Sequence, residues 1–230
     1  MYRYLFLDAD GTLFDFDEAE RRAIILMGAA LDVAIEEFHL NAYQSANLAC
    51  WKAFERGELD LDELKTARFV RFNEETGLTL DPKSASGVYE SNLAHQGILY
   101  EQSIDVLDAL KSRGYTLYFA SNGLANVQRG RIAVANIAHY FEDFFISEEM
   151  GSQKPDIRYF EMMLEKTGLA TRKEECLMVG DSLSSDIAGG IASGIDTLWI
   201  NAHNHGSGSL NPTYTVTSLE EILPLLPSIH

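Results

Sequence analysis

The chain has 230 residues, of which 46% are hydrophobic, so it is long enough for one core and a smaller inserted module. Its 18 basic and 35 acidic residues give a formal net charge of −17. This charge argues against a nucleic-acid polymer or an anionic membrane as partner. There is no signal-peptide pattern and no apolar run of about 18 residues, and Cys176 lies in the apolar run "CLMV". We therefore expect a cytoplasmic protein.

The first predicted elements are a buried strand and a long helical segment. In "LFLDADGTLF" (residues 5–14), large apolar side chains precede Asp8 and Asp10. Residues 17–93 then show helical periodicity, and Gly57 and Gly77 stand where two helices end. The sequence therefore predicts an all-helical domain inserted after the first strand.

From Ile98 onward, short apolar strands alternate with helices. The strands are "YTLYFA", "DFFIS", "ECLMV" and "DTLWI", and the helices lie near 103–112, 124–135, 155–167 and 184–192. This alternation is typical of a parallel sheet that is covered on both faces. We predict an α/β fold, a doubly wound (Rossmann-like) core of residues 1–16 and 94–230, with the helical insert at 17–93.

Asp8 and Asp10 end the first strand. Side chains two residues apart on a strand share a face, and ligands of open α/β sheets bind at this carboxyl end. Two carboxylates about 4 Å apart repel by about 4 kcal/mol at an effective dielectric constant of about 20. The pair therefore needs a cation or a proton. The alternative is structural, because Asp-Gly-Thr is an ordinary turn sequence.

Two later strand ends carry groups that suit an anion. After "YFA", the Ser121 hydroxyl and the backbone N–H groups of Asn122 and Gly123 suit a tetrahedral anion, although the same cluster is a common turn and N-cap. Lys154 precedes Pro155, which favours the first position of a helix and keeps the lysine extended. A lone lysine is otherwise usually surface.

The fourth strand ends in "GDSLSSD", with Asp181 five residues before Asp186. On its own this is as well explained by a helix cap. Taken together, the four strand ends supply carboxylates, a hydroxyl and an ammonium, which a metal ion and a phosphate bound side by side require. Oxygen ligands without His or Cys favour Mg²⁺.

"DADGTL", "ASNG", "KP" and "GDSLSSD" resemble the four motifs of the haloacid dehalogenase superfamily. The helical insert resembles the first-type (C1) cap domain of that superfamily. The resemblance covers essentially the whole chain and implies Mg²⁺-dependent phosphoryl transfer through a covalent aspartyl-phosphate. Asp10 stands where the dehalogenases carry no acid, which implies a phosphatase rather than carbon–halogen cleavage.

The resemblance also assigns roles to single residues. Asp8 corresponds to the nucleophile and Asp10 to the general acid and base. Mg²⁺ is expected at the Asp8 carboxylate, the Asp10 carbonyl and Asp181, with Asp186 as an outer partner of Lys154 or of a metal-bound water. Residues expected to contact phosphate or substrate are Gly11, Phe14, Ser121, Asn122, Gly123 and Lys154.

The nearest resemblance is to the bacterial pyrimidine 5′-nucleotidase branch, on "LDADGTLFDFD", "AYQSANLACWKAFERGEL", "ISEEMGSQKPD" and "WINAHNHG". It implies a nucleoside 5′-monophosphate as a small phosphorylated substrate. Alternatives are a sugar-phosphate phosphatase, a phosphomutase, or a non-catalytic phospho-ligand binding module, which the intact pair Asp8 and Asp10 disfavours. The sequence carries no signal of oligomeric state.

Other residues have two interpretations. Aromatic side chains of the insert and its entry either stack on a base or form the core of the insert; they are Phe14, Phe16, Tyr43, Trp51 and Phe54. Phe14 is the best candidate for a substrate contact. His203 and His205 are either a metal pair or part of a solvated turn that borders the site. Two crossings, 15–17 and 93–98, are the expected hinges, with Gly97 adding freedom.

Overall fold

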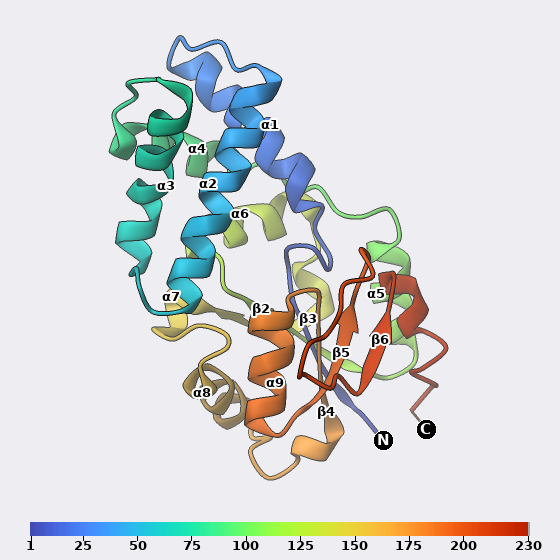
Figure 1. Cartoon of the computed structure of the whole chain (residues 1–230). Helices are drawn as coiled ribbons and strands as arrows, with labels where there is room; N and C mark the ends of the chain where they lie inside the picture. The colour runs from blue at the N-terminus through green and yellow to red at the C-terminus, as the bar shows by residue number, and fades with distance from the viewer. Residues whose placement is uncertain (230) are drawn as a thin grey trace.

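The structure is a computed structural model that describes residues 1–229 of the chain; His230 lies outside it. Its centre is a parallel sheet of six strands in the order β3-β2-β1-β4-β5-β6 (Figure 1). The strands are β1 (Tyr4–Leu7), β2 (Thr116–Ser121), β3 (Phe141–Ile146), β4 (Cys176–Gly180), β5 (Asp196–Ile200) and β6 (Tyr214–Val216). This order confirms the predicted α/β, doubly wound fold.

Helices cover both faces of the sheet. They are α5 (Ser103–Ser112), α6 (Ala125–Ala135), α7 (Ser147–Met150), α8 (Ile157–Thr167), α9 (Ala188–Ser193), the π-helical turn η3 (Leu183–Ile187) and the 3₁₀ turns η1 (Ala138–Tyr140), η2 (Lys173–Glu175) and η4 (Leu219–Ile222). Leu5 and Leu7 of β1 belong to the buried cluster with α5, α6 and η4, whereas Phe6 belongs to the cluster with α8. Alternate residues of one strand thus face two cores, which explains its continuous apolar sequence.

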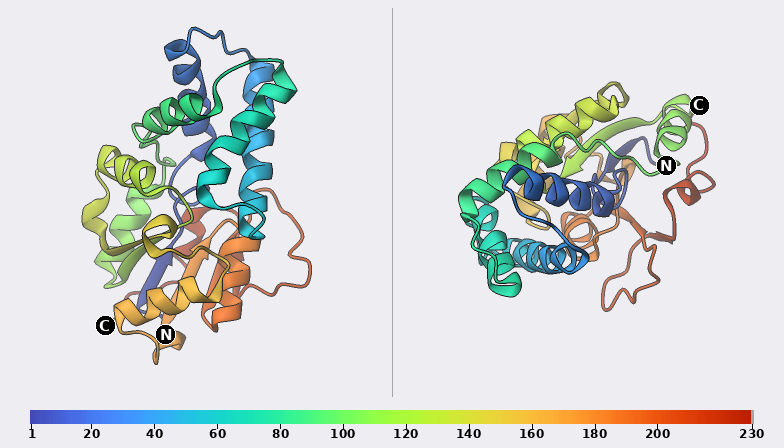
Figure 2. Two further views of the ribbon diagram at one scale, coloured as in Figure 1. Left: turned by 90° about the vertical axis from the view of Figure 1, so that its left-hand side faces the viewer. Right: turned by 90° about the horizontal axis from the view of Figure 1, so that it is seen from above.

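Four further helices stand together beyond the carboxyl ends of the strands (Figures 1 and 2). They are α1 (Phe16–Ala30), α2 (Glu37–Glu55), α3 (Leu61–Thr76) and α4 (Pro82–Leu93). The side chains of Asp15, Asp60 and Asp81 cap α1, α3 and α4 by accepting a backbone N–H. The boundaries proposed for an inserted domain, 17–93, stay a prediction.

Local chemistry corrects two expectations. Pro155 is not the first residue of a helix, because α8 begins at Ile157 and the Asp156 side chain caps it by accepting the Arg158 N–H at 3.0 Å. Gly97 serves close packing rather than freedom, since a Cβ there would lie 2.7 Å from the Ala135 nitrogen. Among residues 1–229, no helix has the length and apolar character needed to span a membrane.

The strand order reverses next to β1. From β1 the chain builds β2 and β3 on one side, and later β4, β5 and β6 on the other. Such a reversal leaves a crevice at the carboxyl ends of the two central strands, where open α/β sheets bind ligands. Helices α1–α4 lie over this end (Figure 1).

Candidate active site

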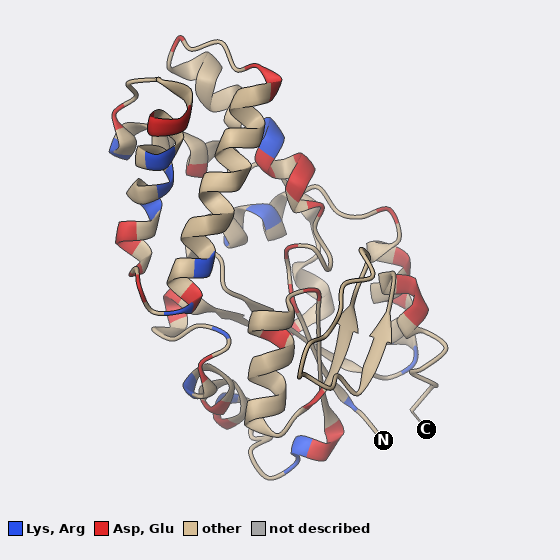
Figure 3. Ribbon diagram, in the orientation of Figure 1, with Lys and Arg blue, Asp and Glu red and all other residues tan. Residues whose placement is uncertain are grey.

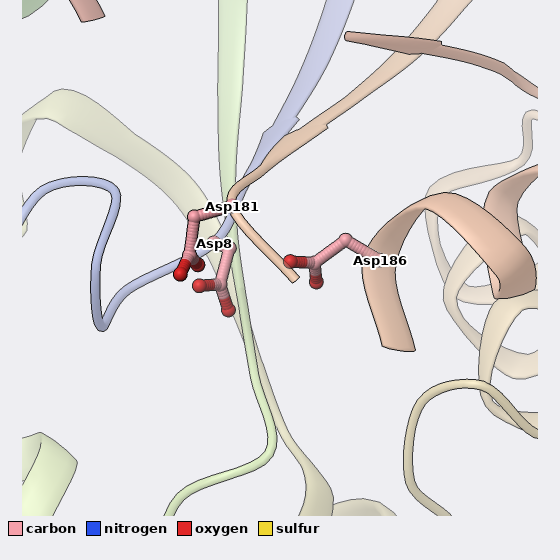
Figure 4. Close-up of side chains that lie close together, drawn as sticks. All are labelled: Asp8, Asp181 and Asp186. Atoms are coloured by element: carbon pink, nitrogen blue, oxygen red, sulfur yellow. The ribbon is translucent and has the colours of Figure 1, made fainter. Parts of the chain in front are cut away.

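Strand pairing brings the first two carboxylates together. Leu7 of β1 pairs with Val179 of β4, and the Asp8 N–H donates to the Val179 carbonyl at 2.9 Å. Asp8 and Asp181 therefore leave adjacent strands at the same level, and their side chains lie side by side in Figure 4. Asp186 approaches them from η3. One carboxylate oxygen from each of the three lies within 4.8 Å of the others.

Lys154 bridges two of these carboxylates, Asp8 and Asp186. Its Nζ donates to Asp8 Oδ1 at 2.5 Å, to Asp186 Oδ1 at 2.6 Å and to the Ala120 carbonyl at 2.8 Å. The lysine side chain is only 1% exposed. All three of its N–H groups are therefore used, and its direction is fixed by two charges and one backbone group.

The cluster holds more negative charge than Lys154 neutralises. Burial raises the pKa of Asp8 well above its ordinary value; Asp186 and Asp181 add to the rise, and Lys154 opposes it. Burial, and then Asp186, raise the pKa of Asp181 to about 7. For Lys154, burial acts to lower the pKa, but Asp186 and Asp8 outweigh it and the net shift is upward. Three carboxylates around one ammonium favour a further cation.

The donor atoms fit a magnesium ion. They are all oxygens, and Asp186 already accepts from Lys154 with Oδ1 and from the Ser182 N–H with Oδ2 at 3.0 Å. Asp8 and Asp181 are therefore the carboxylates left to bind Mg²⁺. Gly11 makes room for this, because a Cβ on it would lie 2.4 Å from Asp181 Oδ2, and its φ is +79°.

Asp10 has partners that the sequence did not reveal. Its Oδ2 accepts from Gln128 Nε2 at 2.8 Å, and its Oδ1 forms an ion pair with Arg131. Arg131 has no exposed surface, and its guanidinium lies 4.3 Å from the centre of the Phe14 ring. Gln128 and Arg131 are three residues apart on α6, a spacing that puts them on one face. That spacing was the available signal, but it does not say what the face contacts.

The groups predicted to hold a phosphate follow β2. Ser121 Oγ accepts from the Gly123 N–H at 3.0 Å and from Gln128 Nε2 at 3.1 Å, so its own proton is left to donate. The Asn122 side chain clamps the Lys154 backbone, accepting its N–H at 2.8 Å and donating to its carbonyl at 2.7 Å. Asn122 therefore positions the lysine as well as lining the site.

These residues open into a cavity of about 620 Å³ between the sheet and the helices α1 and α2. From the sheet side it is lined by Asp8, Asp10, Ser121, Asn122, Gly123, Lys154 and Asp181. From α1 and α2 it is lined by Phe16, Glu20, Asn47, Leu48 and Trp51, among others. A reacting phosphate at the strand ends therefore has room for an attached organic group under the helices.

Some of the aromatic residues line the cavity, and others are buried in the protein core. Phe14 has no exposed surface and packs against Arg131, so the prediction that it contacts substrate is wrong. Tyr43 is fully buried among the aromatic rings of the helical core. Phe16 and Trp51 line the cavity. Periodicity places such residues on a helix but does not decide which side faces the ligand.

His203 and His205 lie beside the site. Their ring centres are 5.7 Å apart. They line a neighbouring cavity of about 810 Å³ together with Asp10, Gly11 and Asp181. Both are exposed, so their position fits a solvated loop at the border of the site.

Glu20 of α1 was not singled out by the sequence. It is 5% exposed, and its Oε1 accepts from Asn47 Nδ2 of α2 at 2.7 Å. Burial raises the pKa of Glu20 to about 7; the Asn47 hydrogen bond opposes this, and the negative charge of Asp17 adds to it. Glu20 therefore keeps its proton to a higher pH than an ordinary glutamate does.

Glu20→Gln is expected to stabilise the protein increasingly as pH rises. The raised pKa means that the folded state holds this proton longer than the unfolded chain, so wild-type stability falls between the ordinary value of 4.5 and about 7. Above a pH of about 7, the wild-type protein has lost about 3 kcal/mol of stability through this group. Denaturant unfolding should show that the free energy of unfolding of the variant, relative to that of wild type, is higher at pH 8 than at pH 5. An equal difference at both pH values would contradict the assignment.

Comparisons with known proteins agree with this fold and site. Residues 2–194 match the haloacid dehalogenase-like hydrolases, so the chain belongs to this family. Pyrimidine 5′-nucleotidase PynA of Streptococcus pneumoniae is 38% identical over 98% of this chain and 95% of its own. Pyrimidine 5′-nucleotidase YjjG of Escherichia coli is 31% identical over 97% of both chains. The magnesium-bound crystal structure of the putative hydrolase YfnB from Bacillus subtilis superposes with a TM-score of 0.91, at 32% identity and 98% coverage of both.

Proposed function

We propose that the protein is a Mg²⁺-dependent phosphatase that hydrolyses nucleoside 5′-monophosphates through an aspartyl-phosphate on Asp8. The observation that carries the proposal is the bridge from Lys154 Nζ to Asp8 and Asp186, beside Asp181, at the floor of a cavity roofed by helices. The similarity to two pyrimidine 5′-nucleotidases supports a nucleotide as substrate.

In the first step, an Asp8 carboxylate oxygen attacks phosphorus. The new bond joins Asp8 to phosphorus, and the bond between phosphorus and the 5′-oxygen breaks. Asp10, as the acid, gives its proton to that leaving oxygen, so the nucleoside departs neutral. Lys154 and the Ser121 hydroxyl stabilise the negative charge of the phosphoryl oxygens. Mg²⁺ bound by Asp8, the Asp10 carbonyl and Asp181 would supply further neutralisation of that charge.

In the second step, water releases the phosphoryl group. Asp10, now a carboxylate, takes a proton from water as its oxygen attacks phosphorus, and the bond between phosphorus and Asp8 breaks. Inorganic phosphate leaves, and both aspartates return to their starting states. Gln128 and Arg131 orient the Asp10 side chain, 30% of which remains exposed. The two steps need no group beyond those named.

The helical segment 17–93 would act as a cap over the core 1–16 and 94–230, moving at the crossings 15–17 and 93–98. The magnesium-bound structure of YfnB is described as revealing interdomain movement, which supports this arrangement. Solution scattering should show compaction when a phosphate analogue is added; an unchanged curve would count against a moving cap. We also place the enzyme in the cytoplasm, since Cys50 and Cys176 are free and buried, and cell fractionation tests that.

A phosphate-release screen tests the proposed function. The purified chain is assayed with Mg²⁺ on uridine, cytidine, thymidine, adenosine and guanosine 5′-monophosphates and on a set of sugar phosphates. We expect release from nucleotides, abolished by EDTA and restored by Mg²⁺. Preferred release from sugar phosphates would instead identify a sugar-phosphate phosphatase, and isomerisation without release would identify a phosphomutase.

A further inference from the structure

We propose that Glu20 and Asn47 form the base-recognition subsite of this enzyme, reading the hydrogen-bonding edge of a pyrimidine. This rests on the proposed nucleotidase function and names the part of the substrate that the helical segment binds. Glu20 on α1 and Asn47 on α2 both line the catalytic cavity and are hydrogen-bonded to each other.

Asn47 has an unused hydrogen-bonding group. Its side chain is on a residue only 3% exposed, its Nδ2 donates to Glu20, and its Oδ1 is buried without a partner among residues 1–229. A buried carbonyl oxygen left without a donor costs about 1–3 kcal/mol. Because Asn47 also lines the cavity, a ligand donor there would remove that cost.

Glu20 supplies the complementary group. Its Oε1 is taken by Asn47, and Oε2 accepts no hydrogen bond from the part of the chain that the structure describes. Glu20 lines the same cavity, and burial, which raises its pKa to about 7, favours the protonated form, whose O–H can donate. The pair thus offers one acceptor, Asn47 Oδ1, and one donor, Glu20 Oε2.

A uracil or thymine edge matches this pair. These bases present the N3–H donor beside the O4 acceptor, so Asn47 Oδ1 accepts from N3–H and Glu20 donates to O4. Cytosine presents its 4-amino donor and N3 acceptor in the opposite order, so it does not match the pair in the same pose. Nucleotide enzymes read bases in this way, with stacking on aromatic or apolar side chains.

Apolar surfaces for the ring lie in the same cavity. Phe16 at the start of α1 and Trp51 on α2 line it, together with Leu48. Phe54 supports Trp51 from an edge-on position, with ring centres 5.7 Å apart. Stacking on such rings contributes about 1–3 kcal/mol per base and tolerates any base. Selection between bases therefore depends on polar groups, and Asn47 Oδ1 is a buried one that has no partner among residues 1–229.

The test compares substrates that differ only at the edge. We measure kcat/KM for uridine 5′-monophosphate, its N3-methyl derivative and ribose 5-phosphate, which has no base. Wild type should prefer the unmodified nucleotide over the methylated one by about 10- to 100-fold, because methylation removes the N3–H donor and leaves Asn47 unpaired. Equal rates for the two nucleotides would overturn the proposal without any variant.

Variants assign the preference to the pair. Asn47→Leu and Glu20→Leu should lower kcat/KM for the nucleotide by about 10- to 100-fold and leave ribose 5-phosphate within about threefold. Glu20→Gln, which keeps a donor and an acceptor, should retain nucleotide activity within about threefold. Asn73→Leu is the matched control. Its amide bonds the Leu80 backbone within the helical segment, so any effect should be equal on both substrates.

The outcomes separate this subsite from the proposed function. A wild-type enzyme that hydrolyses no nucleotide overturns both. An enzyme that hydrolyses uridine 5′-monophosphate, but whose Asn47→Leu variant keeps the preference over ribose 5-phosphate, overturns the subsite alone. Equal losses on both substrates in Asn47→Leu would show a structural role and would also overturn it.

Discussion

Asp8→Asn is expected to fold normally and to lose phosphatase activity by at least about 10⁴-fold, as removal of a nucleophile does in enzymes that form covalent intermediates. The amide has the shape of the carboxylate but is a far poorer nucleophile. It also removes one of three clustered negative charges, so we expect stability no lower than that of wild type. Steady-state phosphate release and thermal unfolding measure the two effects.

The control for this variant is an exposed aspartate that has no place in the site. Asp81→Asn alters the cap of α4, where asparagine is also a good N-cap, so both activity and stability should stay near wild type. Turnover by Asp8→Asn within about tenfold of wild type would be incompatible with a covalent role for Asp8.

Lys154→Met is expected to reduce both stability and activity. The change leaves Asp8 and Asp186 facing each other without their shared ammonium, and removing one member of a buried ion pair costs about 3–5 kcal/mol. Activity should fall by about 10²- to 10³-fold or more, because the variant lacks the cation that holds Asp8 and that we propose stabilises the phosphoryl oxygens. Denaturant unfolding and kcat/KM give the two numbers.

A surface lysine and a double variant make this test specific. Lys83→Met, at an exposed position of α4, should change neither quantity. Lys154→Met combined with Asp186→Asn should recover part of the lost stability, since one unpaired charge is removed, while activity stays low. Wild-type stability in Lys154→Met would show that the bridge between the two carboxylates contributes nothing to the fold.

Much of the fold was predictable because its causes are local. Short apolar runs alternating with helical periodicity predicted the doubly wound sheet, and the confirmed fold places β1, β2 and β4 at the runs expected. The start of α8 was missed by two residues. Pro155 and Asp156 both favour a helix start. The helix begins at Ile157 because the Asp156 side chain caps it by accepting the Arg158 N–H.

The meeting of the charged side chains follows from one topological rule. The carboxyl ends of neighbouring parallel strands share an edge of the sheet, so Asp8 and Asp181 are carried there by the strands that precede them. Lys154 reaches the same point because Asn122, at the end of β2, holds its backbone. The contact between Asn122 and Lys154 joins two loops, and the sequence of neither loop indicates it.

The features of the site that the sequence did not predict depend on contacts between different secondary-structure elements. Arg131 and Gln128 lie on one face of α6, but only the packing of α6 against the turn after β1 shows that this face meets Asp10. The same limit applies to Glu20 and Asn47, which come from different helices. Phe14 was misassigned because its position just after the turn that carries Asp8 and Asp10 does not specify whether its ring faces the cavity or the protein core.

The acidic surface fits a small substrate rather than a polymer. Acidic residues occur on both the sheet side and the helical side of the molecule in Figure 3, and they outnumber basic residues by 35 to 18. An anionic substrate is therefore favoured only where Lys154 and a metal ion offset this charge. That requirement agrees with the substrate site that we propose at the strand ends.

Trapping the covalent intermediate tests the central claim most directly. Asp10→Asn is mixed with Mg²⁺ and p-nitrophenyl phosphate, whose leaving group needs no proton, so the first step proceeds while the second lacks its base. The prediction is a burst of nitrophenolate equal to the enzyme present, with a phosphoryl group on the peptide that contains Asp8 by mass spectrometry. Phosphate release with no burst and no label on Asp8 would contradict it.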